Sequence, residues 1–159
     1  MICGGKIMEK KLNLLLADLV VEYHKLQNFH WYVKGKSFFT LHGKLEELYN
    51  GVNKSIDEVA ENILIIGGKP LGSLKEFLAH SKIKEEEDRY VCGGYILKEV
   101  AADFEYLLNS IKEIKVEADE KNEYIVSSLM DDLMKDFAKT LWMLKQSEEG
   151  KHQHSCDSK

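Results

Sequence analysis

Two pairs of polar residues lie four positions apart in one stretch of the sequence, and their side chains could bind a metal ion. His42 and Glu46 form the first pair, and Asp57 and Glu61 form the second. Residues four apart on an α-helix lie on the same side, about one turn from each other. An imidazole nitrogen with several carboxylate oxygens suits iron, manganese or zinc better than a soft metal. Together the pairs predict a metal site, although each pair alone is common on helices.

The two pairs cannot bind one ion within a single chain. His42 and Asp57 are 15 positions apart, roughly 22 Å along a helix, whereas metal–ligand bonds are about 2.0–2.2 Å long. Two copies of the helix, crossing antiparallel on a two-fold axis near residues 51–52, would bring His42 and Glu46 of one subunit to Asp57 and Glu61 of the other. This arrangement would form the site twice in each dimer.

The segments around these residues have the composition and periodicity of long helices. The only proline is Pro70, and helix interiors exclude proline. Glycines mark the breaks between apolar-periodic stretches. The pattern predicts four long helices, over about 9–34, 38–66, 94–116 and 121–147, and a short one over 73–80.

Apolar residues recur every three or four positions in the first two predicted helices, which is the spacing of a bundle core. In the first helix the stripe comprises Leu12, Leu16, Leu19, Tyr23, Leu26, His30 and Val33. In the second it comprises Leu41, Leu45, Leu48, Val52, Ile56, Val59, Ile63 and Ile66. His30 therefore takes a core position, and by itself it is more simply interpreted as a packed histidine. The second helix has another, mixed face, with His42, Glu46, Tyr49, Asn50, Asn53, Asp57 and Glu61.

Composition restricts the class and the location of the protein. The net charge is -5 with a single arginine, Arg89, which does not suit a nucleic-acid binder. Three cysteines without a CxxC spacing argue against a disulfide framework and favour the cytoplasm. The N-terminus has no apolar core of a signal peptide. We expect a flexible tail over 1–8, one helical domain over 9–147 and a flexible polar tail over 148–159.

Another kind of di-iron bundle builds its site inside one subunit, from Glu-x-x-His pairs on two helices. The only such pair in this sequence is Glu149–His152, across Gly150 in the polar tail. An intrasubunit di-iron oxidase or a haem-binding bundle is therefore disfavoured.

Three segments of the sequence resemble the signature of the Dps family of mini-ferritins. They are Asn28–His42 (NFHWYVKGKSFFTLH), Asp57–Glu61 and the turn Gly67–Leu71. The resemblance implies a ferritin-like four-helix bundle, all-α, with a short helix in its middle connection. It also implies a homo-oligomeric shell of twelve subunits that oxidises Fe(II), preferentially with hydrogen peroxide, and stores the ferric mineral inside.

The resemblance further implies that His30, His42 and Glu46 of one subunit bind iron together with Asp57 and Glu61 of its partner. Two positions depart from the family, since Asn62 stands where an arginine is common and Gly43 where an acidic residue is frequent.

Some family members bind DNA through basic tails. Lys6, Lys10 and Lys11 against Glu9 make only a modestly basic N-terminus. A DNA-binding, nucleoid-compacting shell with little turnover is the alternative function. In the C-terminal tail, His152, His154 and Cys156 could bind zinc, copper or nickel.

Overall fold

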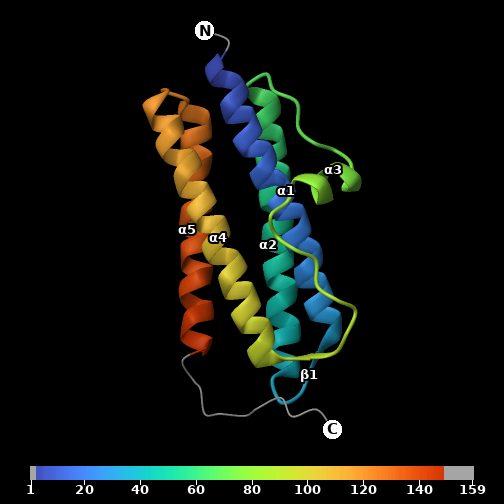
Figure 1. The fold of residues 1–159 in the computed structure, drawn as a ribbon. Coiled ribbons are helices and arrows are strands. Elements are labelled where there is room, and N and C mark those ends of the chain that lie inside the picture. Colours follow the sequence, from blue (N-terminus) through green and yellow to red (C-terminus); the bar gives the residue numbers. More distant parts are fainter. Residues whose placement is uncertain (1–2, 149–159) are drawn as a thin grey trace.

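The computed structural model describes residues 3–148 and has the predicted all-α architecture (Figure 1). Its elements follow in the order α1 (Cys3–Tyr32), β1 (Val33–Lys34), α2 (Phe38–Ile65), α3 (Leu74–His80), β2 (Val91–Cys92), α4 (Gly93–Glu120) and α5 (Tyr124–Glu148). Helix α1 packs mainly on α2, and α4 packs mainly on α5. The short α3 lies in the long connection between the two pairs. The ferritin-like four-helix bundle predicted from the sequence is therefore confirmed.

The apolar stripes of the first two helices form the centre of the bundle. In α1 the stripe is buried except for Tyr23, which is partly exposed, and in α2 it is buried except for the partly exposed Ile56 and Ile66. Phe104 and Phe137 stack in the other helix pair with ring centroids 5.1 Å apart. Burial of these stripes is the main force that holds the helices together.

The ends of α2 are set by glycines that adopt positive φ. Gly35 has φ 102° in the turn after β1, and its carbonyl accepts the N–H of Phe38 at 3.1 Å. Gly67 has φ 78° and ends α2 in a Schellman motif, in which the N–H of Gly68 binds the carbonyl of Ile63 at 2.8 Å. The first turn brings the end of α1 back against the start of α2.

The helix boundaries differ from the prediction mainly at the N-terminus. Helix α1 begins at Cys3, so residues 3–8, which were expected to be a flexible tail, are helical. Met8 is 1% exposed, and this burial explains why the helix starts before the predicted residue 9. Of the predicted C-terminal tail, residues 149–159 lie outside the described residues, and with them His152, His154 and Cys156.

Two further features were not predicted. A two-residue parallel ladder pairs Val33–Lys34 with Val91–Cys92. It holds the long connection against the turn between α1 and α2. Cys92 is disulfide-bonded in the structure, a bond that the spacing of the cysteines did not predict.

No helix within residues 3–148 combines the length and apolar character that a membrane span requires.

Candidate metal centre

His30 and His42 face each other across the turn that joins α1 to α2. The ring centroids are 3.7 Å apart and the ring planes are 19° from parallel. The Nδ1 of His30 lies 2.7 Å from the carbonyl oxygen of His42, and the Nδ1 of His42 lies 2.9 Å from the carbonyl oxygen of His30. Each histidine is thus held by the backbone of the other.

These reciprocal contacts decide which ring nitrogens remain available. A carbonyl oxygen only accepts hydrogen bonds, so each Nδ1 must carry the hydrogen and donate it. In the neutral ring the lone pair then lies on Nε2 of both His30 and His42. A histidine that binds a metal through one nitrogen commonly donates the other N–H to a backbone carbonyl, and this contact fixes the tautomer and ring orientation. The pair therefore fits a metal ion before any ion is bound.

Aromatic rings surround the two histidines. Phe38 stacks on His42 with centroids 5.0 Å apart, and the edge of Tyr49 meets His30 at 5.5 Å and 86°. His30 is 8% exposed, and His42 is partly exposed. Burial raises the pKa of Tyr49, as does the charge of Glu46. The sequence placed Tyr49 on the mixed face of α2, but its contact with His30 was not foreseen.

The three carboxylates are exposed along the same helix. The outer face of α2 carries all three, Glu46, Asp57 and Glu61. Leu64 lies on the same face and is 58% exposed. No three His, Cys, Asp or Glu side chains within residues 3–148 lie close enough to hold a metal ion. Within one chain the two histidines are in contact with each other. Asp57 and Glu61 lie apart from them, further along α2 (Phe38–Ile65).

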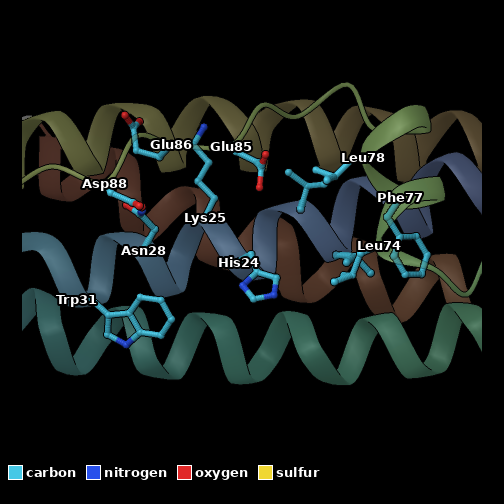
Figure 2. A pocket seen from close by; sticks show the side chains of 12 residues that line it. His24, Lys25, Asn28, Trp31, Leu74, Phe77, Leu78, Glu85, Glu86 and Asp88 are labelled. Carbon is cyan, nitrogen blue, oxygen red and sulfur yellow. The ribbon is translucent and has the colours of Figure 1, made fainter.

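A cavity of about 270 Å³ lies beside this region, between α1, α3 and the connection that follows α3. Figure 2 shows His24, Lys25, Asn28 and Trp31 along α1, with Leu74, Phe77 and Leu78 on α3. None of the five predicted ligands lines it. Trp31, next to His30 in the chain, is 60% exposed, so within a single chain its indole is not packed in the core.

Comparisons with known proteins agree with the fold. The sequence matches the ferritin-like domain family over residues 9–149. It is 41% identical over 134 residues to DNA protection during starvation protein 2 of Bacillus anthracis, covering 84% of this chain and 91% of the relative. It is 34% identical to the DNA protection during starvation protein of Helicobacter pylori, covering 84% of this chain and 93% of the relative.

Two solved structures show the same architecture. Antigen TpF1 from Treponema pallidum superposes with a TM-score of 0.92 at 31% identity, covering 94% of this chain and 96% of that one. A Dps protein of Vibrio cholerae O1, described as a member of a superfamily of ferritin-like diiron-carboxylate proteins, superposes with a TM-score of 0.87 at 33% identity, covering 91% and 90%. The fold and the matching family thus define the class as the ferritin-like proteins. Within that class, this chain belongs to the Dps family.

Proposed function

We propose that this protein oxidises Fe(II), preferentially with hydrogen peroxide, at a di-iron site shared between two-fold related subunits in the cytoplasm. The ferric product is stored as mineral in a hollow shell of twelve subunits. The observation that carries the proposal is the mutual backbone anchoring of His30 and His42, which leaves two imidazole Nε2 atoms available for a metal. Membership of a family of ferritin-like diiron-carboxylate proteins supports iron as the substrate.

The ligand set consists of two halves from different subunits. We call His30, His42 and Glu46 the half-site. The second half is Asp57 and Glu61 of the partner subunit, which an antiparallel crossing of two α2 helices near residues 51–52 would bring to the half-site. The exposure of all three carboxylates on α2 leaves them free to take part in such a contact.

The residue types suit the chemistry. Hard carboxylate oxygens favour Fe(III) over Fe(II) and so promote oxidation, while the imidazoles strengthen binding of the divalent ion. Two Fe(II) ions supply the two electrons that convert one hydrogen peroxide molecule into two hydroxide ions, with two Fe(III) ions as the other product. Because both electrons are delivered together, no hydroxyl radical is released. Removal of iron and peroxide would thereby protect DNA.

Mixing of two inactive variants tests the shared site directly. One variant carries His30→Ala and His42→Ala, and the other carries Asp57→Ala and Glu61→Ala. Each should lose rapid peroxide-driven Fe(II) oxidation while it still assembles. If the site is shared, a mixed dimer has one complete site, made from the histidines of one subunit and the carboxylates of the other.

The readout is the rate of Fe(II) oxidation after the two variants are unfolded together and refolded. Recovery of activity in the mixture, and not in either variant refolded alone, supports the proposal. Oxidation that stays absent in mixed oligomers of normal size would refute the shared site, and unchanged oxidation in the histidine variant would refute the ligand assignment. Oligomer mass is measured in parallel by size-exclusion chromatography with light scattering.

DNA binding receives less support from the described residues. Lys11, one of the three basic residues near the N-terminus, forms an ion pair with Glu117 on α4. The backbone N–H of Lys69 binds the Glu9 carboxylate at 3.0 Å. The basic residues expected in a loose tail thus lie on a packed helix, and the net charge is -5. Iron oxidation remains the function that the structure supports better than nucleoid compaction.

A further inference from the structure

One side of α2 carries exposed side chains along the whole length of the helix. At about 100° per residue they fall in a stripe about 100° wide, away from the buried residues of α2 that pack on α1 and α5. We call this stripe the contact face. Its side chains larger than alanine are Phe39, His42, Glu46, Asn50, Asn53, Asp57, Glu61 and Leu64. All of them are exposed except His42, which is partly exposed.

The contact face is matched to itself about the midpoint between residues 51 and 52. Its side chains form four pairs, and the two members of each pair are equally far from the midpoint in opposite directions along the chain. A two-fold axis through the midpoint would set each residue of one copy opposite its mate on the other copy. The pairs are Phe39–Leu64, His42–Glu61, Glu46–Asp57 and Asn50–Asn53.

The members of the pairs are complementary in charge and polarity. The innermost pair consists of two amides, each of which both donates and accepts hydrogen bonds, and the outermost pair is apolar. An imidazole lies opposite the Glu61 carboxylate. Only Glu46 and Asp57 have the same charge, and both are proposed ligands of a cation that would lie between them. A second copy of this chain therefore suits the contact face better than an unrelated partner.

Phe39 and Leu64 are the members of the contact face that the metal site does not explain. Phe39 is 90% exposed and Leu64 is 58% exposed. The ring of Phe39 meets that of Phe38 edge-on, with centroids 5.4 Å apart at 77°, and Phe38 in turn stacks on His42 at 5.0 Å. A side chain that covers Phe39 would therefore lie at the outer end of the half-site.

We propose that a second copy of this chain docks with Leu64 of the partner subunit against Phe39, once at each end of the paired α2 helices. The inference rests on the two-fold site of the proposed function and adds the contact that aligns its two halves. Phe39 lies roughly 19 Å along the helix from the midpoint. Over this distance, helices that cross at about 20° diverge by roughly 7 Å, and helices that cross at about 50° by roughly 16 Å. The contact therefore requires the shallow crossing.

A charge swap tests the contact between the two copies. The variants are Phe39→Lys, Leu64→Glu and the double variant Phe39→Lys/Leu64→Glu. In one chain these positions lie roughly 37 Å apart along α2, so a lysine at one and a glutamate at the other can pair only between copies. Both positions are exposed, so the fold of the single chain should be unchanged, and circular dichroism checks this.

The readout is the exchange of single subunits between light and isotope-labelled protein, followed by native mass spectrometry without metal. Each single variant should exchange at least about tenfold faster than the wild type, because an unpaired charge is placed in the contact. The double variant should return to within about threefold of the wild type, and about 1 M salt should remove the rescue by screening the ion pair.

Phe39→Lys/Ile65→Glu is the matched control. Ile65 is 63% exposed next to Leu64, but it lies about 90° around the helix from the middle of the contact face. This control should exchange as fast as Phe39→Lys alone. Wild-type exchange in both single variants, or equal rescue by glutamate at positions 64 and 65, would overturn the inference.

The metal-free readout separates this inference from the proposed function. If the charge swap restores slow exchange while the histidine variant oxidises Fe(II) at the wild-type rate, the docking contact stands and the ligand assignment fails. If mixed oligomers of the two inactive variants recover oxidation while the charge swap gives no rescue, the shared site stands and the contact between Phe39 and Leu64 of the partner subunit is wrong.

Discussion

The Nδ1 atoms of His30 and His42 donate to each other's backbone carbonyl oxygens, at 2.7 and 2.9 Å, while the two rings stack at 3.7 Å. The last turn of α1 and the first turns of α2 are thereby joined through the same two residues whose Nε2 atoms make no part of these contacts. Half of the proposed metal site is therefore formed by folding of the chain alone, and the partner subunit has only to supply carboxylates.

His42→Ala tests whether these rings act as ligands. The carbonyl of residue 42 remains in the variant, so His30 keeps its backbone acceptor and the fold is preserved. Since loss of a supporting contact already costs about 10–100-fold, loss of a ligand should slow Fe(II) oxidation by at least about tenfold. Stopped-flow absorbance measures the rate and circular dichroism checks the helices. Oxidation at the wild-type rate in a correctly folded His42→Ala protein would exclude this histidine from the site.

Glu22→Gln should stabilise the protein at neutral pH. Glu22 is fully buried on α1 with neither carboxylate oxygen hydrogen-bonded. Its pKa lies well above the ordinary value of 4.5, because burial disfavours the charge and Asp103 repels it, although the nearby Lys25 acts in the opposite direction. Above pH 4.5 the unfolded chain releases this proton while the folded chain keeps it. Stability thus falls as pH rises toward the folded-state pKa, by about 1.4 kcal/mol per pH unit from this group.

The amide of Glu22→Gln has no proton to release, so this part of the pH dependence should vanish. Urea unfolding at pH 4 should give similar stabilities for variant and wild type, and the variant should be the more stable at pH 7. Glu85→Gln, a substitution of an exposed glutamate, is the matched control. A variant that is less stable than wild type at pH 7 would show that Glu22 is charged in the folded protein.

Asp18→Asn should destabilise the connection that carries α3. The buried Asp18 carboxylate accepts hydrogen bonds from the Tyr106 hydroxyl at 2.6 Å, the backbone N–H of Lys82 at 2.6 Å and the hydroxyl of Ser81 at 2.9 Å. An amide removes the charge and sets an N–H₂ group against one of these donors. We expect a loss of about 2–4 kcal/mol, measured by urea unfolding.

Tyr106→Phe is the graded control for Asp18→Asn. It removes one donor to Asp18 and leaves the bonds to residues 81 and 82, so it should cost about 1–2 kcal/mol. Equal losses in the two variants would mean that the bonds to the connection add nothing to stability.

Gly93→Ala and Gly94→Ala should have opposite effects, although the two glycines are adjacent at the start of α4. A Cβ on Gly93 would lie 2.6 Å from Cδ1 of Leu41, whereas a Cβ on Gly94 would meet nothing within 4 Å. Overpacking predicts a loss of about 1–3 kcal/mol for Gly93→Ala. Gly94→Ala should be neutral or stabilise by up to about 1 kcal/mol, because alanine favours helix. Thermal unfolding measures the melting temperature of each variant. A similar melting temperature for the two variants would contradict the close contact with Leu41.

Local periodicity was enough to predict the helices of the bundle. The spacing of Leu12, Leu16 and Leu19 defines one face of one helix, and neighbours in sequence specify it. The end of α2 could be predicted for the same reason, because Gly67 and Pro70 affect the backbone of the turn in which they lie. The start of α1 was missed because Cys3-Gly4-Gly5 has low helix propensity, and burial of Met8 against other elements outweighs that local signal.

The sequence by itself supplied the proposed ligand types on α2 and their spacing, and from these the prediction that two copies of that helix form the site. Only the tertiary structure decided how the histidines are held, because their acceptors are backbone carbonyls on the other side of a turn, and a side-chain pattern does not reveal them. Tyr49 and Glu22 show the same limit. Nothing in their residue types predicts these surroundings. Packing against α1 places Tyr49 beside His30, and packing within the bundle removes Glu22 from water.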